Sequence, residues 1–123
     1  MTSVDPGDHL ADVAKRMRRD RVGAVAVMRG PQLVGIITER DLMRAVADGI
    51  DPQKASASER MTPEPRTIAA DELAARAAEL MIELGIRHLP VVRAGSVVGV
   101  ISARDLLRLG LRTPPDVLGY EPW

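Results

Sequence analysis

Two hydrophobic periodicities alternate along the chain, and they occur in the same order twice. The first helical stripe, over about residues 8–20, consists of Leu10, Val13, Ala14 and Met17. The second helical stripe consists of Leu73, Ala77, Leu80, Met81 and Leu84. Apolar residues three and four positions apart lie on one side of a helix, so each stripe predicts a helix with one face against a core.

Short extended segments flank each predicted helix. Those before the helices are Ser3-Val4 and Thr67-Ile68, and those after them are Ala24–Met28 and His88–Val92. A turn then leads to a second apolar run, Leu33–Ile37 or Val97–Ile101. Because these second runs are apolar without interruption, they predict strands buried on both faces. Each half closes with a predicted helix, at Glu39–Ala47 and at Ala103–Leu109.

An internal repeat explains this order. Residues 35–42, GIITERDL, align with residues 99–106, GVISARDL, and the same ungapped register also pairs Val4 with Ile68 and Met17 with Met81. A register that holds over most of the chain indicates duplication, and two copies are too few for a solenoid. We therefore expect an α/β (α+β) fold of two strand–helix–strand–strand–helix units, packed as a pseudo-twofold pair.

The repeat divides the chain into four parts. The predicted parts are a first repeat over 1–48, a linker over 49–66, a second repeat over 67–111 and a tail over 112–123. The linker is expected to hold a short helix around Pro52–Arg60, since proline is tolerated at a helix start. Pro63 and Pro65 exclude a longer helix. Tyr120 and Trp123 in the tail are the only aromatic residues, so the core must be aliphatic.

Composition narrows the function classes. The chain has 17 basic and 17 acidic residues, which gives none of the basic excess typical of nucleic-acid binding. No apolar run approaches the roughly 20 residues that a membrane helix needs, and the N-terminus does not resemble a signal peptide. The absence of cysteine fits a reducing cytosol, so we expect a cytoplasmic protein. Two histidines and no cysteine predict no metal site.

The pattern Gly-h-h-Ser/Thr-x-x-Asp, in which h is apolar, occurs at residues 35–41 and 99–105. In both copies it lies where a predicted strand becomes a helix. Glycine lacks a Cβ, so a ligand or another backbone can approach closely. The free N–H groups at the start of a helix favour anions. A carboxylate can accept hydrogen bonds from both hydroxyls of a ribose, and a neighbouring hydroxyl suits a phosphate oxygen.

The same residues have a purely structural interpretation. Ser/Thr-x-x-Asp is close to a helix capping box, with Thr38 and Ser102 as N-caps and with Asp41 and Asp105 three residues later. An isolated pattern of this kind is more often a cap than a ligand site. Its repetition after a glycine-led strand favours ligand binding, and the two roles are compatible.

These features together resemble the CBS domain, arranged as the tandem pair called a Bateman module. The resemblance rests on the order of elements, on the two Gly-h-h-Ser/Thr-x-x-Asp-Leu segments and on the strand Leu89-Pro90-Val91-Val92. Arg60-Met61-Thr62-Pro63 is similar to the segment that often leads into a CBS repeat. The resemblance covers about residues 3–111. It implies two clefts between the repeats, which in this family often bind AMP, ADP or ATP and sometimes S-adenosylmethionine.

The resemblance also implies roles for individual residues. Asp41 and Asp105 would hold the ribose hydroxyls in the two clefts, with Thr38 and Ser102 beside ribose or phosphate. The adenine would be flanked by the first strands and by an apolar wall. The residues expected there are Val4 and Ile68 with their neighbours Ser3 and Thr67, and, for the wall, Ile37 and Ile101.

The two copies differ before the middle strand. The second copy has Arg87-His88 where the first has Gly23-Ala24. In the family, basic groups at this place often meet phosphates. Because phosphate contacts cross between repeats, we expect Arg87, His88 and Arg104 to serve the Asp41 cleft, and we expect the other cleft to be weaker or empty. The alternative is that the arginines are solvated surface residues.

The sequence thus favours a regulatory adenine-nucleotide-binding module, which signals through altered packing of repeats or dimers to a separate protein partner. The second interpretation is a structural or interaction protein of the same fold that binds no nucleotide. No base–nucleophile pair suggests an enzyme. A homodimer is expected, through helix residues Leu42, Met43 and Val46 or Leu106, Leu107 and Leu109.

Overall fold

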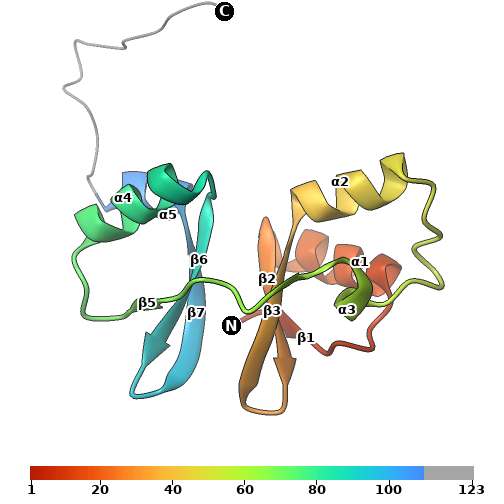
Figure 1. Cartoon of the computed structure of the whole chain (residues 1–123), viewed down its shortest axis with the longest axis horizontal. Coiled ribbons are helices and arrows are strands. Elements are labelled where there is room, and N and C mark those ends of the chain that lie inside the picture. The colour runs from red at the N-terminus through yellow and green to blue at the C-terminus, as the bar shows by residue number, and fades with distance from the viewer. Residues whose placement is uncertain (110–123) are drawn as a thin grey trace, which may run out of the picture.

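The computed structural model describes residues 1–109 and contains two similar units side by side (Figure 1). The strands lie toward the middle of the molecule and the helices toward its outer sides. The last two residues of the predicted second repeat and the predicted tail, with Tyr120 and Trp123, lie outside the described residues.

Each unit has the predicted order of elements. The first unit comprises β1 (Ser3–Val4), α1 (Leu10–Asp20), β2 (Ala24–Arg29), β3 (Gln32–Thr38) and α2 (Glu39–Ala47). The second unit comprises β5 (Ile68–Ala69), α4 (Ala74–Leu84), β6 (His88–Arg93), β7 (Ser96–Ser102) and α5 (Ala103–Arg108). The predicted bounds of α2 are confirmed, and most other bounds differ by one or two residues.

The two sheets have matching topology. In the first sheet β1 pairs in parallel with β2, which pairs antiparallel with β3, and the second sheet repeats this with β5, β6 and β7. The register of the antiparallel pair slips after Val27 in the first sheet and after Val91 in the second. These two positions are equivalent in the repeat, so the irregularity was duplicated with the fold.

The linker forms part of the first unit, which the sequence did not indicate. It contains α3 (Ala57–Arg60) and β4 (Thr62–Pro63), and β4 extends the first sheet by pairing antiparallel with β3. The first residues of α1 donate backbone hydrogen bonds to the linker, from Leu10 N to Ala55 O and from Ala11 N to Pro52 O, both at 2.9 Å. Just before the helix, Asp8 O accepts one from Ala57 N at 2.8 Å. The linker thereby covers one end of the first core.

The glycines that begin the two motifs differ in their surroundings. A Cβ on Gly35 would collide with the side chain of Met61 and lie 3.0 Å from the carbonyl oxygen of Thr62 in β4. A Cβ on Gly99, the equivalent residue, would meet nothing within 4 Å. The close approach of the linker therefore requires glycine only in the first unit.

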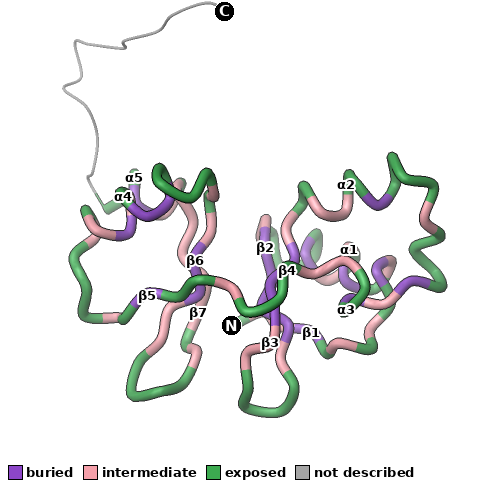
Figure 2. Tube along the Cα trace, in the orientation of Figure 1, coloured by how far each residue is buried: buried purple, intermediate pink, exposed green. Residues whose placement is uncertain are grey.

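Each unit has its own aliphatic core, and the first is the more completely buried (Figure 2). The buried residues of the first core are Val4, Leu10, Val13, Met17, Val25, Val27, Ile37, Ala45, Ala55 and Ala57. Those of the second are Ile68, Ala77, Leu80, Met81, Leu89 and Leu106. The first core gains Ala55 and Ala57 from the linker.

Two predictions about burial in the second unit are wrong. The run Val97–Ile101 is not buried on both faces, since no residue of β7 is buried and Val98 is 45% exposed. β7 is the edge of its three-stranded sheet within the described residues. Leu73 and Leu84 of the predicted stripe are also exposed, because they lie at the two ends of α4 and beyond its buried face.

The helix residues predicted for a dimer contact differ in exposure, and Leu42 is partly buried against the first core. Met43, Val46, Leu107 and Leu109 are exposed. Leu106 is 4% exposed and belongs to the second core, so it is not available for contact with another chain. Homodimer formation itself remains a prediction. Over residues 1–109, no helix has the length and apolar character to span a bilayer.

Candidate functional site

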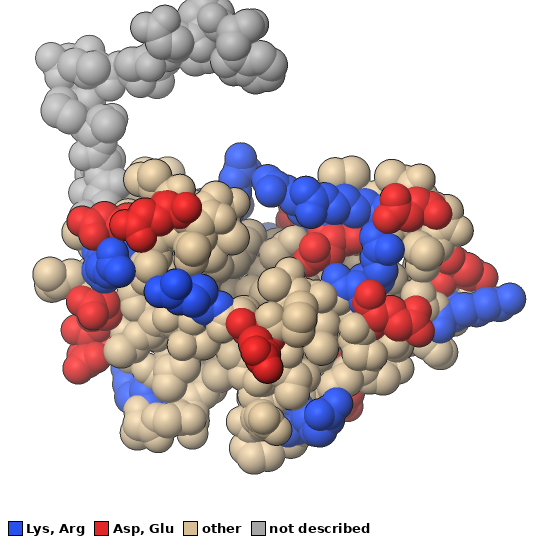
Figure 3. All heavy atoms as spheres, viewed as in Figure 1, with Lys and Arg blue, Asp and Glu red and all other residues tan. Residues whose placement is uncertain are grey.

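Between the units, residues of the described part of the chain line two cavities. One, of about 1560 Å³, contains Ser102 and Asp105, and the other, of about 530 Å³, contains Thr38 and Asp41. We call them the Asp105 cavity and the Asp41 cavity. Figure 3 shows a hollow between the units on the face it presents, with basic side chains along its upper edge.

The linings of the two cavities are related by the internal repeat. The Asp41 cavity combines the end of β3 and the start of α2 with residues 84–88 of the second unit. The Asp105 cavity combines the end of β7 and the start of α5 with residues 20–24 of the first unit. Each cavity therefore takes its Ser/Thr-x-x-Asp segment from one unit and its opposite wall from the other.

The Ser/Thr-x-x-Asp segments form the predicted capping boxes. In α2, Asp41 Oδ2 accepts hydrogen bonds from Thr38 N at 2.9 Å and from Thr38 Oγ1 at 3.1 Å, while Thr38 Oγ1 accepts one from Asp41 N. In α5, Asp105 Oδ2 accepts from Ser102 N at 2.8 Å, and Ser102 Oγ accepts from Asp105 N at 3.0 Å. The capping interpretation is confirmed in both units.

Capping leaves hydrogen-bonding capacity on both aspartates. The bonds to each aspartate side chain end on Oδ2, and Oδ1 accepts none from the described residues. An ionised carboxylate offers about four acceptor sites over its two oxygens. Each cap thus fixes the position of a carboxylate whose second oxygen can accept from a ligand hydroxyl.

The predicted apolar wall is formed by other residues. Ile37 and Ile101 pack in the cores, whereas their neighbours Ile36 and Val100 line the cavities. Successive side chains of a strand point to opposite faces. The apolar runs contain hydrophobic residues on both faces, so their sequence did not indicate which face lines the cavity.

In the first strand of each unit, β1 and β5, the predicted apolar residue also lies in the core while neighbouring residues line the cavities. Val4 and Ile68 lie in the cores, and exposed Thr67 lines neither cavity. The Asp105 cavity is lined by Thr2 and Ser3, and the Asp41 cavity by Arg66, the repeat equivalent of Thr2. Of the residues predicted beside adenine, Ser3 alone reaches a cavity.

The predicted distribution of basic groups is wrong in two respects. Arg104 lines the Asp105 cavity and not the Asp41 cavity, because it precedes Asp105 on α5. The Asp105 cavity is also lined by seven arginines and three carboxylates, against four arginines and three carboxylates for the other. The first unit supplies four of the seven, from residues 16–21 at the end of α1. The Asp105 cavity is thus the more basic of the two.

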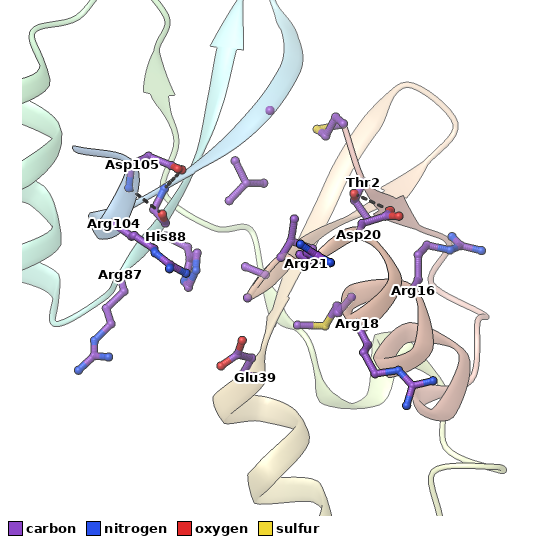
Figure 4. Close-up of a pocket in the computed structure, with 18 of the residues that line it drawn as sticks. Thr2, Arg16, Arg18, Asp20, Arg21, Glu39, Arg87, His88, Arg104 and Asp105 are labelled. Atoms are coloured by element: carbon purple, nitrogen blue, oxygen red, sulfur yellow. Dashed lines mark hydrogen bonds between the residues drawn. The ribbon is translucent and has the colours of Figure 1, made fainter. Parts of the chain in front are cut away.

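Arg87 and His88 line both cavities, together with Gly23 and Glu39, so these four residues form the wall between them. Figure 4 shows Glu39, Arg87 and His88 among the residues that line the Asp105 cavity. A Cβ on Gly23 would lie 3.1 Å from Glu39 Oε1 and 3.3 Å from His88 Nε2. The closeness of both side chains explains why this position suits glycine.

Burial lowers the pKa of His88 below its ordinary value of 6.5. The neighbouring carboxylates of Glu39 and Asp105 oppose this shift, and the charge of Arg87 reinforces it. The histidine is therefore held largely neutral at neutral pH. Among the described residues, no group of three or more histidines or carboxylates is placed to hold a metal ion.

Several cavity residues were not predicted from the sequence. Arg21 could have been identified from the sequence, because an arginine stands at the end of α1 where the second repeat has Gly85. Ile36, Val100 and Arg66 carried no such signal. Their place in the cavities depends on strand orientation and on the packing of one unit against the other.

Comparison with known proteins agrees with this architecture. The family model of the CBS domain matches residues 1–48 and 57–112. The CBS domain-containing protein CBSCBSPB2 of Arabidopsis thaliana is 34% identical over 107 residues, which cover 85% of this chain and 20% of that protein. Over three curated relatives, the chain spans 64%, 20% and 55% of their length.

Two solved structures contain ligands. The CBS domain protein PAE2072 from Pyrobaculum aerophilum, complexed with AMP, is 30% identical with a TM-score of 0.77, over 91% of this chain and 94% of that chain. The CBS domain pair of protein MJ0100, in complex with 5-methylthioadenosine and S-adenosyl-L-methionine, is 26% identical with a TM-score of 0.78, over 89% of each chain. The predicted fold class is confirmed by these matches. This chain belongs to the CBS-domain family and contains a tandem pair of its repeats.

Proposed function

We propose that this chain is a regulatory module that binds adenine nucleotides in its Asp41 and Asp105 cavities. The observation that carries the proposal is the duplicated arrangement of each cavity. A capped, partly unsatisfied carboxylate and a hydroxyl from one unit face basic and apolar groups of the other unit. The carboxylate and the hydroxyl suit a ribose, the basic groups suit a phosphate, and the apolar groups suit a flat base.

In this proposal Asp41 and Asp105 accept hydrogen bonds from the ribose hydroxyls through Oδ1. Thr38 and Ser102 hold the carboxylates in place through the caps. Arg87 and His88 reach a phosphate from the wall shared by the cavities, and Ile36 and Val100 replace Ile37 and Ile101 as the apolar surface for the base.

CBS-domain pairs are in general regulatory rather than catalytic. A ligand that bridges the two units stabilises the relative arrangement in which its contacts are best, and so shifts the population of arrangements. We propose that a separate protein partner, or another part of a longer chain, responds to this shift. An adenosine with a sulfonium chain, as in the MJ0100 complex, is the second ligand candidate.

Thermal unfolding in the presence of AMP, ADP, ATP and S-adenosylmethionine tests the proposal. A ligand at 100 times its dissociation constant stabilises the fold by about 2.7 kcal/mol, which shifts the melting temperature of a domain of this size by several degrees. We expect such a shift with at least one adenine nucleotide. Absence of a shift with all three nucleotides at millimolar concentration would contradict it and favour a structural role.

A further inference from the structure

The end of α1 differs in charge and geometry from the equivalent end of α4. The last residues are Arg18-Arg19-Asp20-Arg21 in the first unit and Ile82-Glu83-Leu84-Gly85 in the second. The last turn of α1 contains basic residues and the last turn of α4 contains none. All four residues of the α1 segment line the Asp105 cavity.

Arg21 has an unfavourable backbone conformation. It ends α1 with a φ of 55°, in the left-handed region, whereas the equivalent residue of α4 is Gly85 with a φ of 65°. Glycine adopts this conformation readily, and a side chain makes it less stable. Backbone strain of this kind concentrates at functional sites, where a side chain is needed for more than folding.

The side chain of Arg21 is available for a ligand. It forms no hydrogen bond or ion pair with another described residue, whereas Arg19 is paired with Asp20 at 2.9 Å and Arg16 donates to Ser3 O at 2.7 Å. In Figure 4, Arg21 and Arg104 lie on facing sides of the cavity, and the guanidinium groups of Arg16 and Arg18 extend away from it. Arg104 and Arg108 are likewise unpaired among the described residues and line the cavity one turn apart on α5.

A ligand held at Asp105 thus has unpaired guanidinium groups on both sides. Among the arginines that line this cavity, Arg21, Arg104 and Arg108 are unpaired within the described part of the chain, and their combined positive charge favours the more negative ligand. Guanidinium groups bind phosphate oxygens in bidentate fashion, so each added phosphate has a matching donor.

We propose that the Asp105 cavity selects a nucleoside di- or triphosphate over the monophosphate, with Arg21 as the residue that determines this preference. The inference rests on the proposed function, and it assigns the ligand class to one of the two cavities. The alternative explanation is that Arg21 only offsets the negative end of the α1 dipole.

The two explanations are separated by calorimetric titration of AMP, ADP and ATP without divalent cations. The protein carries Asp41→Ala, which leaves the Asp105 cavity as the site to be measured, and Arg21 is either kept or changed to glycine or lysine. Arg21→Gly introduces the residue that the second unit already has at this position, so the fold is retained. Arg21→Lys keeps the charge and serves as the matched control.

We expect Arg21→Gly to weaken ATP binding about five- to tenfold and AMP binding less than twofold, because a charged hydrogen bond to a terminal phosphate is lost. Arg21→Lys should keep most of the preference for ATP. An equal loss for ATP and AMP, or no loss for either, would overturn the assignment while leaving nucleotide binding intact. If none of the three nucleotides bound to either the wild-type protein or the Asp41→Ala variant, both the assignment of Arg21 and the proposed function would be contradicted.

Discussion

The two units share one fold and one register of repeat, yet they differ in what covers them. The first unit is closed by its linker, which adds β4 to the sheet and Ala55 and Ala57 to the core. The second unit presents β7 as an edge among the described residues, and its core is less completely buried. The difference teaches that duplication preserved the capped aspartates of the cavities more faithfully than the packing around them.

The largest difference between the two units is expected for a pair of equivalent core substitutions. Ile37 is 0% exposed and Ile101 is partly exposed. We expect Ile37→Ala to lower the free energy of unfolding by about 2–5 kcal/mol, because it leaves a cavity in a closed core. Ile101→Ala should cost about 1–2 kcal/mol, since less apolar area is removed from burial. Urea denaturation measures both, and equal losses would show that the cores are equally closed.

The second test uses the glycines that begin the two motifs. Gly35→Ala should destabilise the fold by about 1–3 kcal/mol, because the added Cβ collides with Met61. Gly99→Ala has open space and should be neutral or stabilise by up to about 1 kcal/mol, because glycine is costly within a strand. The melting temperatures of both variants check this, and a Gly99→Ala loss as large as that of Gly35→Ala would contradict the described packing of β4.

The smallest effect concerns the wall between the cavities. Burial lowers the folded-state pKa of His88, so below pH 6.5 the unfolded chain binds a proton more readily than the folded one. Stability from this group is therefore complete above pH 6.5 and is lost as the pH falls through the lower, folded pKa. His88→Ala, which introduces the residue of the first repeat at Ala24, should flatten the decline in stability as the pH falls below 6.5. An unchanged slope would show that His88 does not contribute.

Much of the fold could be predicted because the repeat supplied two independent observations of each element. The period of three to four residues identified the buried faces of α1 and α4, and the capping pattern located the starts of α2 and α5. β4 was not predicted, because Thr62 and Pro63 pair with a strand of the preceding repeat and contain no period of their own. Edge strands tolerate proline, so Pro63 gave no evidence against pairing.

Only part of the candidate site could be predicted, namely the part that depends on local sequence patterns. Thr38, Asp41, Ser102 and Asp105 follow from a local pattern, and the structure places them in the two cavities. Arg104 was assigned to the wrong cavity, and Ile37 and Ile101 to the wrong side of their strands. Those assignments depend on strand orientation and on contact between units, which no local pattern contains.

The central claim is that both cavities bind an adenine nucleotide through their capped aspartates. Calorimetric titration with ATP of the wild-type chain, Asp41→Asn and Asp105→Asn tests it most directly, because asparagine nearly preserves the size of the cap and removes its charge. We predict two nucleotides per chain for the wild type and loss or marked weakening of a different one in each variant. Binding of ATP with the same number of sites and the same affinities in all three proteins would contradict the claim.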